Sequence, residues 1–498
     1  MPPEFQDDAA PCPPPPPAEV PAVEPGSRPE PHFSRAITAL AALVLVAGLA
    51  AFTWLQVTIP PLERVAHPER ALTHMVGRMM DLEEAIARAP AWEQALYDLT
   101  SGGREYELVQ AIQWFEELQA AGGAPAVSIQ LAVLYAEAGH LDWIQGETVE
   151  WKVRREPFPS YARILTAAYL APRLPMEEEV SLQGELAELL PEGWFYDRLA
   201  INLARKAGDV SLLAATQKAM AVRGDPLLKR ARLLAAMECM VLFLGSVTLG
   251  IWQGKVRRAG AGWLRMGSVR LPPCWPGSVA VAVLLRGGAL TVITIALLLL
   301  LGRDDLFFRL AAIPMSNLPL MFLATRHLLA PVGLKLRNGL GLAFPSGSVW
   351  TVTGAVLALL AVGLLGEWLI DRIAVSFGTA SHWTEWFDPD LTWGNRPVLV
   401  VSLLEYVVLA PFFEEVVFRG LVFATLRRRF AWVPAALISA TIFAAAHGYG
   451  ILGFASVLWS GMIWAWAYEK TGSLWPGMIA HALNNFMVCL TLMALLRW

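Results

Sequence analysis

Charge is scarce in this sequence. Asp, Glu, Lys and Arg together make up only 16% of the 498 residues, whereas hydrophobic residues make up 55% and the mean hydropathy is +0.46. Soluble globular proteins carry about 25% charged residues. The shortage of charge therefore argues against an ordinary soluble protein and predicts a membrane protein.

Paired cysteines and an excess of positive charge are missing as well. The four cysteines, Cys12, Cys239, Cys274 and Cys489, lie far apart and form no Cys-x-x-Cys pair. This spacing argues against a disulfide scaffold and against a thiolate zinc site. The formal net charge is −4, so the chain lacks the basic footprint of nucleic-acid-binding proteins. We expect no nucleic acid among its partners.

Long apolar runs divide the chain. Residues 1–35 are rich in proline and predict a disordered cytoplasmic tail. Residues 36–59 predict a signal-anchor transmembrane helix, because about 20 apolar residues cross a bilayer core. The other predicted spans are 236–253, 278–301, 306–330, 347–370, 397–423, 432–447, 450–468 and 475–496. Together these runs predict an all-α polytopic membrane protein with about nine transmembrane helices.

The charged loops between these spans predict the orientation of the chain. Basic residues fill alternate loops: Lys255, Arg257, Arg258, Arg265, Arg270, Lys335, Arg337 and Arg427–Arg429. The intervening loops carry the acids Asp304, Asp305, Glu367, Asp371, Glu385, Asp388 and Asp390. Basic loops stay in the cytoplasm, so we expect a cytoplasmic N-terminus and an extracytoplasmic segment 60–235, in a bacterial inner membrane.

Residues 60–235 regain charge and show helical patterning. Leu131 and Tyr135 are followed 34 residues later by Leu165 and Tyr169, and after another 34 residues by Leu199 and Leu203. A period of 34 residues built from helical pairs resembles the tetratricopeptide (TPR) repeat. We therefore predict a TPR-like helical domain, with the repeats in 90–235 and a surface for a protein partner. An α-helical domain with accidental spacing is the alternative.

Ionisable residues inside a predicted span are costly, and one span holds several. Glu414, Glu415 and Arg419 fall within Pro411–Gly420, and Glu405 precedes them in the same span. Left unpaired, the first three would cost roughly 8–10 kcal/mol on insertion scales. Glu415 and Arg419 are spaced i, i+4 and can pair on one helix face. Glu414 points away from that pair, whereas Glu405 fits a cavity-lining or structural role.

Two later spans carry further polar groups. His447 ends an otherwise apolar run in the motif Phe443-Ala-Ala-Ala-His447. His481 and Asn485 are spaced i, i+4, so they share one face of their helix. Each group alone has a structural explanation: a core histidine at His447, and interhelical hydrogen bonding by His481 and Asn485. Glu414, Glu415 and Arg419 alone would fit a buried ion-pair network.

The three motifs together resemble a known family. Glu-Glu-x-x-x-Arg at 414–419, Phe-x-x-x-His at 443–447 and His-x-x-x-Asn at 481–485 occur in this order on separate predicted helices. This pattern resembles the CAAX protease and bacteriocin-processing (CPBP) family, which includes the type II CAAX prenyl endopeptidases. The resemblance covers about residues 340–498, the expected protease core. Residues 236–339 would supply further transmembrane helices.

The resemblance implies an intramembrane endopeptidase and a role for each motif residue. Glu414 would activate a water molecule, assisted by His447, while His481 and Asn485 would stabilise the oxyanion of the tetrahedral intermediate. Glu415 and Arg419 would support the glutamate helix. The implied substrate is a membrane-associated or lipidated peptide in the bilayer, and no cofactor is required. A low-dielectric site suits a carboxylate acting as general base.

Three alternatives stay open at this stage. Glu414, His447 and His481 are also a His₂Glu set that zinc accepts, although the chain has no His-Glu-x-x-His motif. The same fold would also serve a non-catalytic membrane scaffold or an immunity protein. A transporter is the third alternative, because intramembrane acids often mark ion paths.

Overall fold

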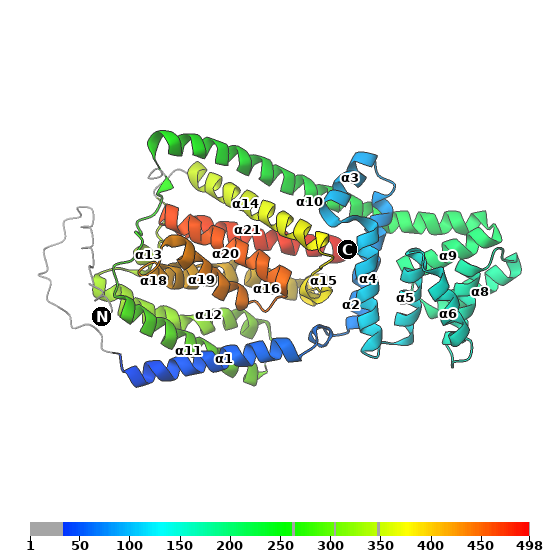
Figure 1. The fold of residues 1–498 in the computed structure, drawn as a ribbon, viewed down its shortest axis with the longest axis horizontal. Coiled ribbons are helices and arrows are strands. Elements are labelled where there is room, and N and C mark those ends of the chain that lie inside the picture. The colour runs from blue at the N-terminus through cyan, green and yellow to red at the C-terminus, as the bar shows by residue number, and fades with distance from the viewer. Residues whose placement is uncertain (1–32, 261–263, 303–304, 346–348, 498) are drawn as a thin grey trace, which may run out of the picture.

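The computed structural model describes residues 33–260, 264–302, 305–345 and 349–497, and it contains no strand within these ranges. The molecule is elongated, with a bundle of long helices at one end and a smaller group of shorter helices at the other (Figure 1). The predicted tail, residues 1–35, lies outside the described residues except for its last three. The prediction of an all-α fold is confirmed.

Within the described residues, eight helices are long and apolar enough to cross a membrane. They are α1 (Arg35–Thr58), α10 (Val210–Ala259), α11 (Gly277–Leu301), α12 (Leu306–Ala324) with its π-helical and 3₁₀ continuation to Val332, α14 (Val349–Ser376), the segment Arg396–Leu426, α20 (Ile451–Thr471) and α21 (Trp475–Leu492) with its π-helical end, η9 (Met493–Arg497). The chain is therefore a multi-pass membrane protein.

The remaining predicted span, 432–447, is shorter in the structure than the other eight. Helix α19 (Trp432–Ala445) has 14 residues, and at a rise of 1.5 Å per residue it is about 21 Å long. A bilayer core is about 30 Å thick, so α19 is too short to cross it in an upright position. It packs along α20 as one arm of a hairpin.

The segment Arg396–Leu426 is a chain of short elements rather than one regular helix. It contains α16 (Arg396–Leu404), η7 (Glu405–Leu409), α17 (Ala410–Glu414), η8 (Glu415–Phe423) and α18 (Ala424–Leu426), and both η elements are π-helices. π-helical turns are rare and often mark functional sites. Here they flank the short helix that ends at Glu414.

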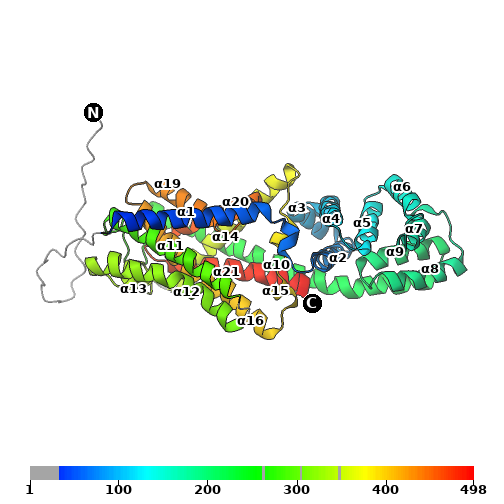
Figure 2. The ribbon, with the colours of Figure 1, turned by 90° about the horizontal axis from the view of Figure 1, so that it is seen from below.

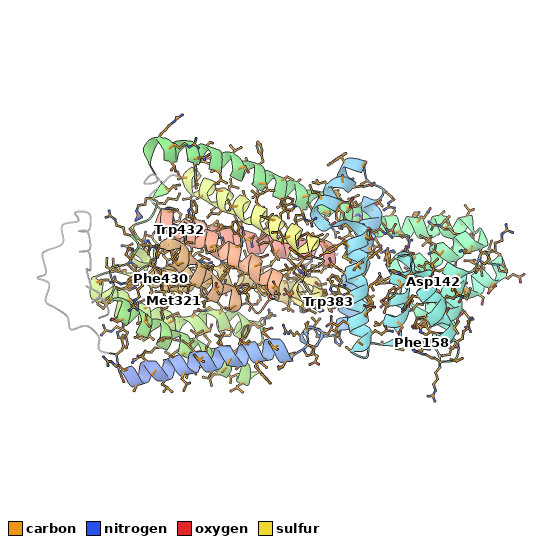
Figure 3. The ribbon with its side chains drawn as sticks, in the orientation of Figure 1. Asp142, Phe158, Met321, Trp383, Phe430 and Trp432 are labelled. Atoms are coloured by element: carbon orange, nitrogen blue, oxygen red, sulfur yellow. The ribbon has the colours of Figure 1, made fainter. Side chains whose placement is uncertain are left out.

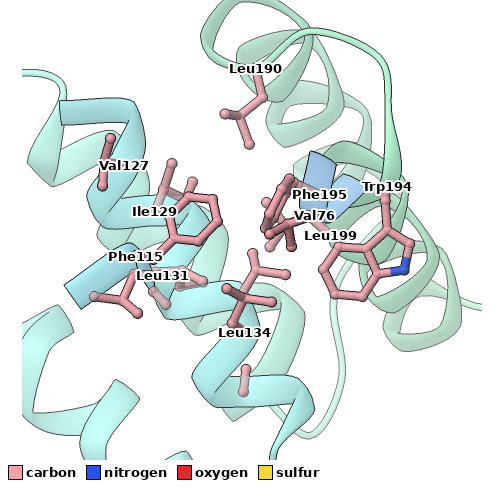
Figure 4. Close-up of a cluster of buried hydrophobic side chains, with 14 of the residues drawn as sticks. Val76, Phe115, Val127, Ile129, Leu131, Leu134, Leu190, Trp194, Phe195 and Leu199 are labelled. Atoms are coloured by element: carbon pink, nitrogen blue, oxygen red, sulfur yellow. The ribbon is translucent and has the colours of Figure 1, made fainter. Parts of the chain in front are cut away.

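The helical domain is the group of shorter helices at the other end of the molecule. It comprises α2 (Pro68–Ile86), α3 (Ala91–Ser101), α4 (Gly103–Ala120), α5 (Pro125–Glu137), α6 (Leu141–Trp151), α7 (Phe158–Leu165), α8 (Met176–Leu189), α9 (Trp194–Ala207) and the first part of α10. Leu131, Leu165 and Leu199, which are 34 residues apart, lie buried on α5, α7 and α9. Figure 4 shows part of this core, including Leu131, Leu199 and Phe115.

Helix α10 joins the two parts of the molecule. It is continuous over 50 residues, from the Asp209 cap to Ala259, and it crosses the predicted boundary at 235 without interruption. Figure 2 shows it running from the helical domain along the bundle. It contacts α2 and α9 in the domain and α14 in the bundle, so the helical domain is attached through a helix rather than through a flexible linker.

The basic loops meet at the end of the bundle that lies away from the helical domain. Arg428 donates to the Pro273 carbonyl at 2.7 Å, and Arg427 forms an ion pair with Glu469 at 2.8 Å. The backbone amides of Met266 and Gly267 bond to Thr471 nearby. Loops far apart in sequence thus form one basic end.

The helical domain docks on the opposite end by capping the last helix of the bundle. His74 Nε2 lies 2.7 Å from the Leu496 carbonyl, Arg78 donates to the Leu495 carbonyl at 2.9 Å, and Arg230 donates to the Ala494 carbonyl at 3.1 Å. The last carbonyls of a helix have no partner within the helix. The helical domain therefore provides hydrogen-bond partners for the last backbone carbonyls of η9.

A buried acid pair in the helical domain gives a first testable prediction. Glu83 and Glu107 are buried, and Tyr97 donates to Glu107 Oε1 at 2.7 Å. Burial and the neighbouring Glu83 raise the pKa of Glu107 to about 8. The unfolded chain has a lower pKa, so the folded state holds the extra proton between about pH 4.5 and 8, and stability falls as pH rises through that window.

We expect Glu107→Gln to remove most of this fall, which is on the order of 2–4 kcal/mol. The measurement is the thermal unfolding of the full-length protein at pH 5 and pH 8.5. Glu105→Gln, an exposed change on the same helix, is the matched control and should behave like the wild type. An unchanged pH dependence in Glu107→Gln would contradict the prediction.

Candidate active site

Glu414 is the accessible acid of the site. It is the last residue of α17, and 28% of its side chain is exposed. Its Oε2 lies 3.6 Å from Nε2 of His481 on α21. This distance is longer than a direct hydrogen bond. The carboxylate therefore faces the imidazole without a direct hydrogen bond to it.

The neighbouring Glu415 is buried, and its Oε1 is shared by two partners. Its Oε1 lies 3.0 Å from Nη1 of Arg419 and 3.1 Å from Nδ1 of His481. Only about 1% of the side chains of Glu415 and Arg419 is exposed. The predicted i, i+4 pairing is present, and it forms inside the π-helical stretch η8.

Arg419 is also enclosed by aromatic rings. Its guanidinium carbon lies 4.4 Å from the centre of the Phe443 ring and 5.1 Å from that of Trp464. Cation–π contacts compensate part of the lost hydration of a buried cation. Gly461 makes room nearby, because a Cβ there would lie 2.8 Å from that of Ala440. The close approach of α19 and α20 thus closes this cage.

His481 is held in one orientation from two sides. Its ring stacks on Trp464 with centres 4.0 Å apart and planes 17° apart. Nδ1 faces Glu415, so Nε2 is directed toward Glu414. A histidine whose one nitrogen is bound by a carboxylate has a defined tautomer and ring orientation. The two glutamates therefore lie on opposite sides of the same ring, with Glu415 bonded to Nδ1 and Glu414 facing Nε2.

His447 lies just beyond the end of α19. Its Nδ1 is 2.8 Å from the carbonyl of Phe443, and its ring packs edge-on against the Phe443 ring at 4.7 Å. The Phe443 ring in turn contacts the His481 ring at 6.0 Å. His447 is partly exposed. His447 of the Phe-x-x-x-His motif and His481 of the His-x-x-x-Asn motif therefore both contact the ring of Phe443.

Asn485 donates from Nδ2 to the carbonyl of Tyr406 at 2.9 Å. This carbonyl has no helical partner, for a local reason. In η7 the amide of Ala410 bonds to Glu405, and the next residue, Pro411, has no N–H to offer. Asn485 thereby satisfies a backbone group freed by the π-helix. Its second amide hydrogen remains for another acceptor.

Glu405 belongs to a separate polar cluster. Arg309 on α12 bonds to Glu405 at 2.8 Å, to Asp390 at 2.8 Å and to Ser402 at 3.3 Å. These contacts agree with the structural role expected for Glu405. Sequence reasoning missed Arg309 and Trp464 as partners of the predicted residues. Neither belongs to a recognisable motif, so only the packing of the helices identifies them.

The zinc alternative requires three converging ligands. Among the residues that the structure describes, no group of three His, Cys, Asp or Glu side chains lies close enough to hold a metal ion. His447 Nδ1 and His481 Nδ1 are engaged by protein groups. A zinc site formed by Glu414, His447 and His481 would need these side chains to move closer together.

Comparison with known proteins places this site in a family. The sequence model of the Rce1-like type II CAAX prenyl endopeptidases matches residues 396–487, which contain all three motifs. The "Uncharacterized 24.3 kDa protein" of Escherichia coli is 30% identical over 186 residues, covering 36% of this chain and 77% of that protein. The "Putative membrane peptidase YdiL" of Bacillus subtilis (strain 168) is 27% identical over 165 residues, covering 32% of this chain and 62% of that protein. No solved structure matches.

These matches confirm the resemblance inferred from the motifs. They fall on the part of the chain that carries Glu414, His447, His481 and Asn485. The chain belongs to the Rce1-like family of type II CAAX prenyl endopeptidases, a family of membrane proteases.

Proposed function

We propose that this protein is an intramembrane endopeptidase that hydrolyses peptide bonds with a water molecule activated by Glu414. The observation that carries the proposal is the difference between two adjacent acids. Glu415 is buried and neutralised by Arg419, whereas Glu414 is partly exposed and faces an oriented imidazole. A general base needs a carboxylate that can reach water and substrate.

The charges of the site support a proton-transfer role. Arg419 balances Glu415, which leaves the charge of Glu414 to be balanced in a low-dielectric region. A carboxylate without a paired cation is free to accept a proton, and that is what water activation requires. In this mechanism Glu414 removes a proton from water as the hydroxide attacks the scissile carbonyl, and it later returns a proton to the leaving amine.

The remaining motif residues have supporting parts in this mechanism. Because Nδ1 of His481 donates to Glu415, Nε2 carries a hydrogen only in the imidazolium form; in that form Nε2 would donate to the developing oxyanion together with the second amide hydrogen of Asn485. His447, whose Nδ1 is engaged by a backbone carbonyl, would assist the water through Nε2. Glu415 and Arg419 would hold Glu414 and His481 in position.

The proposed substrate is a membrane-associated or lipidated peptide. The basic end of the bundle supports a cytoplasmic position for that end, with the helical domain on the extracytoplasmic side of a bacterial inner membrane. The repeat-like packing of α5, α7 and α9 supports recruitment of a peptide or protein partner by the helical domain. No cofactor is needed for this chemistry.

The test is cleavage by the purified full-length protein in lipid nanodiscs. A library of membrane-anchored peptides is presented with and without a zinc chelator, and products are identified by mass spectrometry. We expect new termini with the wild type and with Arg428→Ala, which alters the basic end only, and none with Glu414→Ala. Loss of cleavage on chelation would favour the zinc alternative. Folded protein without any product would favour the non-catalytic scaffold.

A further inference from the structure

The loop between α14 and α16, residues 377–395, touches both the helical domain and the site. It contains η6 (Trp383–Glu385) and α15 (Pro389–Trp393). Figure 3 shows Trp383 at the junction between the bundle and the helical domain. The sequence marks this loop only by its acids, and two of them, Glu385 and Asp388, have no part in the site described above.

One set of side chains in the loop belongs to the helical domain. Trp383 and Phe387 are buried in the same hydrophobic cluster as the core of that domain. His382 Nε2 lies 2.8 Å from Glu117 on α4, and Tyr106 donates to the Thr379 carbonyl at 2.9 Å. The guanidinium of Arg70 lies over the ring of Trp393 at 4.5 Å. The domain thus holds this loop along its length.

Glu385 points the other way and contacts the His447 segment. Its Oε1 accepts from the backbone amide of Gly450 at 3.1 Å, three residues after His447. This amide is at the N-terminus of α20, where a carboxylate is favoured. Glycines admit the carboxylate: a Cβ at Gly450 or Gly453 would lie 2.8 Å or 3.1 Å from its oxygens.

Asp388 contacts the Asn485 side of the site. Its Oδ1 caps α15 at the Leu391 amide, and its Oδ2 accepts from the Tyr406 hydroxyl at 2.8 Å. Tyr406 is also the residue whose carbonyl receives Asn485 Nδ2. The loop therefore bonds to the segment after His447 through Glu385, and to Tyr406, the partner of Asn485, through Asp388.

We propose that residues 382–388 are a strut through which the helical domain positions the Glu414 site, with Glu385 as the positioning residue for His447 and Asp388 as that for Asn485. Within the strut, Trp383 and Phe387 anchor on the domain while Glu385 and Asp388 face the site. The proposal rests on the proposed function for the catalytic meaning of that site. It makes the docking of the helical domain a determinant of turnover.

The first experiment compares Glu385→Ala with Glu385→Gln in the full-length protein in nanodiscs. Glutamine keeps an oxygen that accepts from Gly450, whereas alanine does not. In the alanine variant we expect kcat to fall about tenfold or more, because small displacements of catalytic groups are costly, with KM changed by less than about threefold. The glutamine variant should keep most of the activity. Glu469→Ala, at the basic end, is the control.

A second readout does not depend on cleavage. Hydrogen–deuterium exchange of residues 447–451 should speed up roughly tenfold in Glu385→Ala and stay near wild type in Glu385→Gln, since exchange reports local opening. Tyr406→Phe, which removes only the hydroxyl bonded to Asp388, should likewise loosen the peptides around 404–410. If wild type cleaves nothing but these exchange changes appear, the strut stands and the proposed function fails.

The domain side of the strut is tested with Arg70→Met, Tyr106→Phe and Glu117→Ala combined. These three changes lie on the helical domain and remove its polar and cation–π contacts with the loop. We expect faster exchange in 447–451 as well as in 377–395. Faster exchange confined to 377–395, or an active wild type matched in activity by Glu385→Ala, would overturn the proposal.

Discussion

Replacing Glu414 with glutamine should reduce peptide cleavage by about 10²–10⁴-fold, the usual contribution of a general base. Glutamine has nearly the same shape but cannot accept the proton of the attacking water. Glu414 is partly exposed and lies 3.6 Å from His481, outside the buried ion pair, so we expect the variant to fold. The measurement is kcat on a peptide identified in the nanodisc library.

Glu367→Gln is the matched control for this variant. Glu367, predicted above to lie in a loop, falls within a membrane-spanning helix, α14, and it belongs to none of the three motifs. Its substitution should leave kcat within about twofold of wild type. Wild-type turnover in Glu414→Gln, or equal losses in both variants, would contradict the role of Glu414 as the base.

Replacing Arg419 with methionine should destabilise the membrane bundle by about 3–5 kcal/mol, because a buried carboxylate loses its partner. Glu415 is only 1% exposed, so bulk solvent does not reach its carboxylate to replace the guanidinium 3.0 Å away. The Phe443 and Trp464 rings that enclose Arg419 would also lose their cation. The measurement is the folded fraction that survives heating, determined by size-exclusion chromatography.

The double variant Glu415→Gln and Arg419→Met separates charge from packing. It removes both charges, so most of the lost stability should return, since a buried pair is often replaceable as a unit. Arg88→Met breaks an exposed ion pair with Asp225 in the helical domain and should cost about 1 kcal/mol or less. Equal destabilisation by Arg419→Met and Arg88→Met would show that the buried pair contributes little.

Much of the site follows from residue type and order. Charged residues inside apolar runs must find partners, so Glu415 and Arg419 were predictable as a pair, and His481 as a neighbour of the glutamate helix. The count of spans was less predictable, because the apolar run around α19 does not reveal where its helix ends. The bond from Asn485 to the Tyr406 carbonyl also depends on a π-helix, which hydrophobic periodicity does not reveal.

The sequence by itself determined the membrane class, the all-α fold and the family, because these depend on composition, apolar run length and motif order. Only the tertiary structure decided what the acids of the 377–395 loop do. In the sequence, Glu385 and Asp388 are markers of a loop that faces away from the basic end. In the folded molecule Glu385 bonds to the segment after His447, and Asp388 bonds to Tyr406, the partner of Asn485, while Trp383 and Phe387 join the helical domain. These contacts, which join residues 65 positions apart for Glu385 and Gly450 and 18 apart for Asp388 and Tyr406, arise from packing, which no local pattern encodes.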